Sequence, residues 1–172
     1  MKLSKAPLIS KDAIRTRVQE IAGEISADYQ GLEPVVIGVL TGAVFFFGDL
    51  VRELTIPCRM DFIRAESYGS GSESSGNVRL TKDLELDVRG EAVILVEDIV
   101  DTGLTMHSIV DLLSVKDPAS VAVCALIDKS ERRCKDVRID YTGFKVEEGF
   151  LVGYGLDFKE RYRQLPDIYT LE

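Results

Sequence analysis

Three runs of almost continuous apolar residues constrain the fold of this chain more than any other feature. They cover residues 34–40, 92–96 and 120–127, and each is rich in valine, isoleucine or leucine. Strands that are apolar on both faces occur in parallel sheets whose two faces are covered by helices. Helical patterns stand between these runs, which indicates repeated strand–helix–strand units. The sequence therefore predicts an α/β fold with a mostly parallel sheet.

The helical pattern is clearest near the start of the chain. Ile14, Val18, Ile21 and Ile25 recur at spacings of three or four residues, which predicts an amphipathic helix over about 10–30. We expect further helices over about 43–54 and 104–115, and further strands near 58–65, 78–86, 137–142 and 150–154, followed by a polar tail.

A segment rich in serine and glycine interrupts this pattern. Eight of the ten residues in 67–76 are Ser or Gly, so no packed helix or strand is expected there. Strand-like segments lie on both sides of it. We interpret it as a loop within a single domain that covers residues 1–172.

The charge balance limits the possible partners. The chain has 172 residues, with 21 Lys+Arg against 29 Asp+Glu and a net charge of −8. General binders of nucleic acid or anionic membranes need a cationic face, so neither partner is expected. No apolar run is long enough to span a bilayer, and no signal-peptide core follows the first residues. The three cysteines lack metal-type spacing, which favours reduced thiols and a cytoplasmic protein.

Acidic residues follow the second apolar run. Glu97, Asp98 and Asp101 are expected at the carboxyl edge of the sheet, where open α/β sheets bind ligands. The next residues open a helix, and its free N–H groups and hydroxyls form an anion site; they are Thr102, Gly103, Leu104 and Thr105. Two adjacent carboxylates can accept hydrogen bonds from a sugar diol while the helix start holds a phosphate of the same sugar. Magnesium can bridge the remaining carboxylate and phosphate oxygens. This arrangement predicts a ribose phosphate ligand.

Residues 93–105 resemble the phosphoribosyl-pyrophosphate signature, which consists of hydrophobic residues, two acids and a Thr-Gly turn. The particular form Glu-Asp-Ile-Val-Asp-Thr-Gly is similar to the hypoxanthine-guanine phosphoribosyltransferase family. Residues 38–42, 67–68, 129 and 150–157 extend the resemblance, which covers about 35–165. It implies the type I phosphoribosyltransferase fold, a mostly parallel sheet flanked by helices. It also implies a small hood of C-terminal and N-terminal segments, with the base-binding part at about 129–172, and a flexible lid loop at about 67–78.

The resemblance implies purine salvage, in which hypoxanthine or guanine reacts with phosphoribosyl pyrophosphate to give IMP or GMP and pyrophosphate. Glu97 and Asp98 would hold the ribose hydroxyls. The residues that would cradle the 5-phosphate are Thr102, Gly103, Leu104 and Thr105. The residues that would bind pyrophosphate are Leu40, Thr41, Gly42 and Arg163. The loop of residues 40–42 often contains a non-proline cis peptide in the family. Many relatives have a cation at the position of Thr41, and some have Lys at that of Leu104.

The remaining implied contacts concern the base, the metal and the lid. Asp101 would act as general base or acid at N7 of the purine, and Lys129 would bind the 6-oxo group. Phe150 would stack on the base, and the backbone of Leu151 would meet its far edge. Asp157 would bind Mg²⁺, which also holds pyrophosphate. Ser67 and Tyr68 would belong to the lid.

Other interpretations stay open at this point. Taken alone, Lys129 fits a solvated loop, Phe150 a core residue and Asp157 a surface acid. A transferase that prefers xanthine is one alternative. A nucleotide-sensing, RNA-binding regulator with the same fold is another, because fold alone does not determine function. The resemblance implies a homodimer or homotetramer, for which the helix after Gly42 offers an interface.

Overall fold

The computed structural model describes residues 2–67 and 78–171. The predicted lid residue Tyr68 therefore lies outside the described residues, while Ser67 is the last residue of a strand. In chain order the elements are α1 (Lys11–Asp28), β1 (Val35–Leu40), α2 (Val44–Glu53), β2 (Arg59–Ser67), β3 (Val78–Lys82), β4 (Ala92–Val100), α3 (Leu104–Ser114), β5 (Ser120–Asp128), β6 (Tyr141–Lys145), β7 (Phe150–Val152) and β8 (Tyr169–Leu171).

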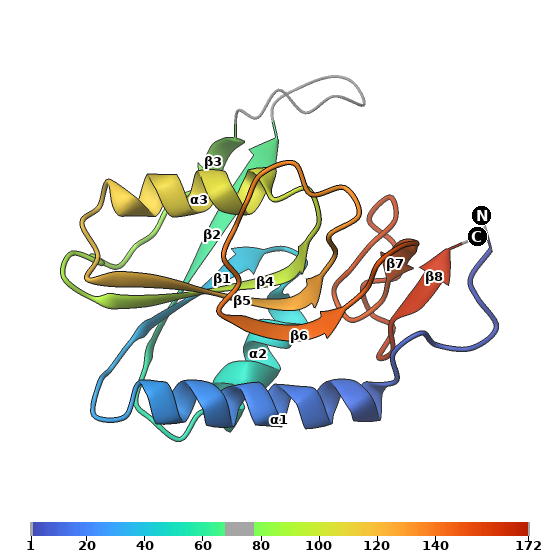
Figure 1. Ribbon diagram of the computed structural model, residues 1–172, viewed down its shortest axis with the longest axis horizontal. Coiled ribbons are helices and arrows are strands. Elements are labelled where there is room, and N and C mark those ends of the chain that lie inside the picture. The colour runs from blue at the N-terminus through green and yellow to red at the C-terminus, as the bar shows by residue number, and fades with distance from the viewer. Residues whose placement is uncertain (1, 68–77, 172) are drawn as a thin grey trace.

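The main sheet confirms the predicted α/β class (Figure 1). Its six strands run in the order β3-β2-β1-β4-β5-β6. Every neighbouring pair is parallel except β2 and β3, which are antiparallel. The order reverses between β1 and β4, so the carboxyl ends of these two central strands open the crevice where such sheets bind ligands.

Helices cover both faces of this sheet, with α1 and α2 on one side and α3 on the other (Figure 1). The side chains of β1 and β4 alternate between the two layers. Val36 and Ile94 belong to the apolar cluster under α1 and α2, whereas Ile37 and Leu95 belong to the cluster under α3. Each fully buried side chain of this size contributes about 1.5–3 kcal/mol. Burial on both faces explains the continuously apolar runs in the sequence.

A second, two-stranded antiparallel sheet of β7 and β8 forms the hood. The N-terminal segment joins it, because Leu3 bridges to Leu171 and Ile9 bridges to Ile168. The expectation of a polar tail is therefore wrong for residues 169–171. Ile168 is completely buried and Leu171 is 8% exposed, so this end of the chain packs as part of the hood.

Several strand boundaries also differ from expectation. β4 continues to Val100 instead of ending at Val96, because its last residues pair with β5. Of the predicted strand 78–86, only Val78–Lys82 forms β3. The backbone N–H groups of Glu85 and Leu86 donate instead to the Asp61 carboxylate, which ends the strand pairing. The strand expected at 137–142 is Tyr141–Lys145. Within the described residues, no helix has the length and apolar character needed to cross a membrane.

Candidate active site

Two adjacent buried carboxylates lie near the carboxyl end of β4. Glu97 is 7% exposed and Asp98 is 9% exposed. The Asp98 N–H donates to Glu97 Oε1 at 3.1 Å, and the Ile99 N–H donates to Asp98 Oδ1 at 2.8 Å. Burial, together with the neighbouring Asp98 carboxylate, raises the pKa of Glu97 well above its ordinary value. Burial also raises the pKa of Asp98. Hydroxyl donors from a ligand would stabilise the ionised forms of both groups.

Asp101 follows directly after β4, and its two carboxylate oxygens have different surroundings. Oδ2 accepts hydrogen bonds from Nε of Arg132 at 3.1 Å and from Nη2 of the same guanidinium. Oδ1 is buried and has no hydrogen-bond partner among the described residues. A buried carboxylate oxygen without a partner costs free energy unless a ligand supplies a donor. Oδ1 is thus available to accept a proton or hydrogen bond from a ligand.

The turn that follows is shaped as an anion site at the start of α3. Gly103 precedes the helix with φ +81°, a left-handed conformation that glycine adopts without strain. A Cβ at this position would collide with the carbonyl oxygen of Lys135. The Thr102 carbonyl accepts the N–H groups of Cys134 and Lys135 at 3.0 and 3.1 Å. The segment after β5 therefore holds the turn. The Leu104 N–H, the first of α3, donates to Thr102 Oγ1 at 3.4 Å. The other N–H groups in the first turn of a helix have no partner within the helix, which makes a helix start suited to an anion.

The turn between β1 and α2 lies against the same carboxylates. The Leu40–Thr41 peptide is cis, as the resemblance implies. A Cβ at Gly42 would collide with the Asp98 carboxylate, so the backbone of this turn touches the end of β4. A Cβ at Gly155 would collide with the Gly42 carbonyl oxygen, so the hood also reaches this turn. Gly42 is the point at which β1, β4 and the hood meet.

Asp157 and Arg163 form an ion pair in the loop between β7 and β8. Arg163 Nη2 lies 2.8 Å from Asp157 Oδ1, and Arg163 Nη1 donates to the Gly155 carbonyl at 2.7 Å. The positive charge of Arg163 also lowers the pKa of Asp98 against the larger effect of burial. The predicted pyrophosphate and metal residues of the hood are therefore electrostatically coupled to the end of β4.

Lys129 comes directly after β5 and is only 7% exposed. Its N–H donates to the Val100 carbonyl at 3.0 Å, which holds it beside the end of β4. Its Nζ lies 3.5 Å from Glu131. An ammonium group has three N–H donors, so its contact with Glu131 leaves donors that can bind a carbonyl oxygen of a ligand.

The predicted stacking residue starts the first strand of the hood. Phe150 is 44% exposed, whereas Leu151 is 6% exposed. The ring of Phe150 meets Phe158 edge-on, with ring centroids 5.5 Å apart. Phe158 follows Asp157 in sequence, so these rings connect the predicted stacking platform to the predicted metal residue. The exposed face of an aromatic ring offers a surface for a planar base.

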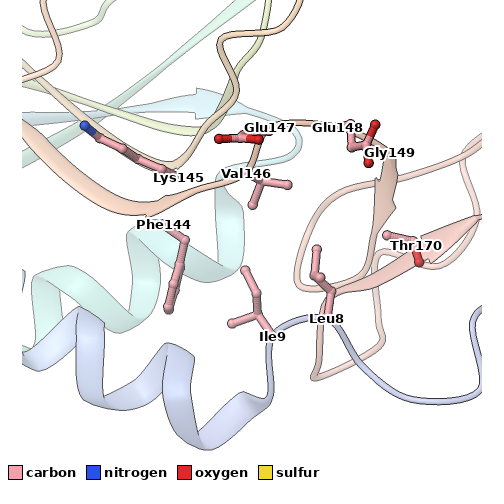
Figure 2. A pocket seen from close by; sticks show the side chains of 9 residues that line it. All are labelled: Leu8, Ile9, Phe144, Lys145, Val146, Glu147, Glu148, Gly149 and Thr170. Carbon is pink, nitrogen blue, oxygen red and sulfur yellow. The ribbon is translucent and has the colours of Figure 1, made fainter.

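The signature lines one of several pockets in the described part of the chain. A pocket of about 110 Å³ runs along the signature and is lined by Glu97, Ile99, Val100, Asp101, Thr102, Gly103, Thr105 and Met106. A larger cavity of about 670 Å³ lies between the N-terminal segment, β6 and the hood (Figure 2). Its lining includes Ile9, Phe144 and Val146 and none of the carboxylates of the signature. The smaller pocket is therefore the candidate site, because it is the one lined by the acids of the signature and by the start of α3.

Two arginines and the apolar residues of the pocket lining, Ile99, Val100 and Met106, were not predicted as site residues from the sequence. Arg132 binds the Asp101 carboxylate. Arg133 donates to the Asp101 carbonyl at 2.8 Å and to Asp128 Oδ1 at 2.6 Å, and so connects the ends of β4 and β5. Ile99 is an apolar member of the pocket lining, beside the acids. In the sequence, only the run of basic residues after Lys129 pointed to these arginines. That run does not indicate which of its cations contacts a carboxylate of the site.

The comparisons with known proteins agree with this geometry. The phosphoribosyl transferase domain family matches residues 9–159. A hypoxanthine-guanine phosphoribosyltransferase of Aquifex aeolicus is 46% identical over 96% of this chain and 93% of its own length. A hypoxanthine-guanine-xanthine phosphoribosyltransferase of Tritrichomonas foetus is 45% identical over 96% of this chain and 90% of its own.

Solved structures give the same result. The crystal structure of a hypoxanthine-guanine phosphoribosyltransferase from Bacillus anthracis is 42% identical, with a TM-score of 0.93, and the match covers 98% of this chain and 99% of that one. Sequence and fold therefore agree along almost the whole length of the chain. The family model, these relatives and this structure show that the chain belongs to the hypoxanthine-guanine phosphoribosyltransferase family of phosphoribosyl transferase domains.

Proposed function

We propose that the protein transfers the phosphoribosyl group of phosphoribosyl pyrophosphate to hypoxanthine or guanine, releasing pyrophosphate in a purine salvage reaction. One observation carries this proposal. Glu97, Asp101 and Gly103 line one small pocket, and Asp98 is the buried carboxylate next to Glu97. Asp101 Oδ1 is buried without a hydrogen-bond partner among the described residues. A sugar diol, a phosphate and a proton donor would match these three features.

The ribose and its 5-phosphate would occupy the end of β4 and the start of α3. The hydroxyls would donate to Glu97 and Asp98. The phosphate would accept hydrogen bonds from the backbone and hydroxyls of the turn, namely Thr102, Gly103, Leu104 and Thr105. Leu104 offers no cation, so the helix start and its N–H groups would carry this contact.

Pyrophosphate would bind between the turn at Leu40, Thr41 and Gly42 and the guanidinium of Arg163. Asp157 would hold Mg²⁺ there. No group of three or more His, Cys, Asp or Glu residues gathers into a metal site in the described part of the chain. This fits Mg²⁺, which keeps several waters and uses one or two carboxylates together with substrate phosphates. When bound, the ion neutralises charge that develops on the departing pyrophosphate.

The purine would lie between the hood and the end of β4. Phe150 would stack on it, the Leu151 backbone would contact its edge, and the Lys129 ammonium would donate to the 6-oxo group. As N9 forms its bond to C1 of the ribose, the bond from C1 to pyrophosphate breaks, with oxocarbenium-like charge on the sugar. The proton on N7 would pass to the Asp101 carboxylate.

The alternative of an RNA-binding regulator gains no support from the arrangement of charge. Four arginines in the basic segments 129–138 and 159–163 form ion pairs with carboxylates: Arg132 with Asp101, Arg133 with Asp128, Arg138 with Asp140 and Arg163 with Asp157. Backbone phosphates would have to compete with these pairs. A transferase that prefers xanthine stays a candidate, because the Tritrichomonas foetus relative is named for all three bases.

A second copy of the chain is the proposed partner, as a homodimer or homotetramer. The exposed first turn of α2 supports this, since Val44 is 37% exposed and Phe45 is 45% exposed. Light scattering after gel filtration measures the number of chains in the assembly, and a monomer at micromolar concentration would contradict this proposal.

The single domain over residues 1–172 and the cytoplasmic location also stay predictions.

A competition assay tests the function. Purified protein, Mg²⁺ and a fixed concentration of phosphoribosyl pyrophosphate are incubated with hypoxanthine, guanine and xanthine, separately and together. We expect turnover of hypoxanthine or guanine that depends on Mg²⁺. Turnover of xanthine alone would favour the alternative enzyme, and no turnover of any 6-oxopurine would overturn the proposal.

A further inference from the structure

A partly buried hydrogen bond joins the hood to α2, between a buried tyrosine and an exposed aspartate. The Tyr154 hydroxyl donates to Asp49 Oδ2 at 2.6 Å, and Tyr154 is only 8% exposed. Burial, reinforced by this bond to Asp49, raises the pKa of the Tyr154 hydroxyl far above its ordinary value. The hydroxyl therefore keeps its proton and stays a hydrogen-bond donor at neutral pH.

One end of this bond leads to the turn predicted to hold pyrophosphate. Asp49 lies on α2, which begins at Val44, two residues after Gly42. The Val44 N–H donates to the Thr41 carbonyl at 3.2 Å, which joins the turn to the first residue of the helix. The position of Asp49 is therefore transmitted to the turn through a short stretch of hydrogen-bonded backbone.

The other end leads to the cation and carboxylate predicted for the same subsite. Gly155 follows Tyr154 and packs on the Gly42 carbonyl. The Gly155 N–H donates to the Arg163 carbonyl at 3.0 Å, and the Arg163 guanidinium donates back to the Gly155 carbonyl at 2.7 Å. A displacement of Tyr154 would therefore move Arg163 relative to Gly42.

The backbone around Tyr154 depends on this anchor. Tyr154 has φ +49°, between Gly153 at +102° and Gly155 at +100°. Left-handed backbone is unfavourable for a bulky residue such as tyrosine, and it persists where surrounding contacts fix it. The Tyr154 N–H donates to the Leu165 carbonyl at 2.7 Å, so side chain and backbone together hold this turn.

We propose that Tyr154 and Asp49 are positioning residues that set the distance between the turn at Gly42 and the segment of Asp157 and Arg163. The inference rests on the proposed function, because it assigns these two segments to one pyrophosphate subsite. Neither side chain needs to touch the substrate. Loss of the bond would weaken binding of phosphoribosyl pyrophosphate and of pyrophosphate, while binding of the purine would change little.

The chain supplies a matched control for this test. The Tyr141 hydroxyl donates to Asp28 Oδ2 at 2.7 Å and joins β6 to the end of α1, so this bond involves neither the turn at Gly42 nor the segment of Asp157 and Arg163. Tyr154→Phe and Tyr141→Phe each remove one partly buried hydrogen bond from a buried tyrosine to an exposed aspartate, so both variants should lose a similar amount of thermal stability. Only Tyr154→Phe should change the kinetics.

We expect Tyr154→Phe to raise KM for phosphoribosyl pyrophosphate and the inhibition constant of pyrophosphate by about tenfold, the size expected for losing one hydrogen bond to a charged group. KM for hypoxanthine and kcat should stay within about twofold of the wild type. Equal kinetic changes in Tyr154→Phe and Tyr141→Phe, or a change confined to KM for the purine, would overturn the proposal.

Two substitutions of the acceptor complete the test. Asp49→Asn keeps an oxygen that accepts from Tyr154 and should retain the wild-type KM, whereas Asp49→Leu should resemble Tyr154→Phe. The double variant Tyr154→Phe/Asp49→Leu should have the same KM for phosphoribosyl pyrophosphate as either single variant, since both substitutions remove the same bond. Calorimetric titration with phosphoribosyl pyrophosphate and Mg²⁺ separates the two proposals. If the wild type binds phosphoribosyl pyrophosphate but turns over no 6-oxopurine, only the proposed function is contradicted. If Tyr154→Phe binds phosphoribosyl pyrophosphate as tightly as the wild type, only the role of Tyr154 and Asp49 is contradicted.

Discussion

Arg132 holds the Asp101 carboxylate by one of its two oxygens. Its guanidinium binds Oδ2, with Nε at 3.1 Å, while Oδ1 is buried without a hydrogen-bond partner in the described part of the chain. The Arg132 side chain is 66% exposed, so the cation reaches the acid from the solvent side. This geometry orients the carboxylate and leaves one oxygen without a donor among the described residues, as the proposed proton transfer requires.

Replacing this acid should affect chemistry more than binding. We expect Asp101→Asn to lower kcat by about 10²–10⁴, the usual contribution of a positioned general base. The dissociation constant of phosphoribosyl pyrophosphate should stay within about threefold of the wild type. Single-turnover kinetics and calorimetry measure the two quantities. Asp136→Asn, which alters an exposed acid, is the control. Equal losses in kcat and cosubstrate affinity would contradict the proposed proton transfer.

The buried amine of Lys129 should control base selectivity. Its ammonium has only donors, which match a 6-oxo group and oppose the amino group of adenine. We expect Lys129→Gln to lower kcat/KM for hypoxanthine by about tenfold to a hundredfold and to reduce the preference for hypoxanthine over adenine. Steady-state assays with both bases test this, with the exposed Lys135→Gln as control. An unchanged preference in Lys129→Gln would exclude the proposed contact.

Gly42 should tolerate no side chain. A methyl group there would collide with the Asp98 carboxylate, whereas one at Gly48 would meet nothing within 4 Å. Gly48 lies inside α2, so Gly48→Ala should stabilise the protein by up to about 1 kcal/mol without loss of activity. Gly42→Ala should lose at least about 10²-fold in kcat/KM, because it displaces the turn and the carboxylate together. Assays with thermal melting compare the two variants, and an active Gly42→Ala enzyme would refute the close approach.

Asp61 should make stability depend on pH at the acidic end. Burial alone would raise its pKa, but backbone N–H donors, including those of Leu86 and Phe62, and the charge of Lys82 together hold the pKa below its ordinary value. Stability from a depressed pKa is present above the unfolded value, about 3.9, and is lost as the pH falls through the folded value. Asp61→Asn should cost about 2 kcal/mol at pH 7.

The difference between wild type and Asp61→Asn should therefore shrink as the pH falls from about 5 to 3. Urea unfolding at several pH values measures it, with Asp136→Asn run in parallel. A difference that is the same at pH 3 and pH 7 would show that the carboxylate charge contributes nothing to the stability of the fold.

Local patterns in the sequence were sufficient for most elements. The apolar runs of β1, β4 and β5 and the spacing in α1 report how each segment is buried, and burial follows a fixed period in strands and helices. Pairing between segments was harder to predict. The sequence did not indicate that Ile168 and Leu171 pack against Ile9 and Leu3, because that contact joins the two ends of the chain.

The sequence by itself determined the order of strands and helices, the acids at the end of β4 and the glycine turn at the start of α3. These features depend on residues that are neighbours in the chain. Only the tertiary structure decided that Arg132 would hold Asp101, that Gly42 would touch both Asp98 and Gly155, and that Tyr154 would bond to Asp49 across 105 positions. Such contacts arise when segments that are distant in the chain pack against one another, and the local period of hydrophobicity does not predict them.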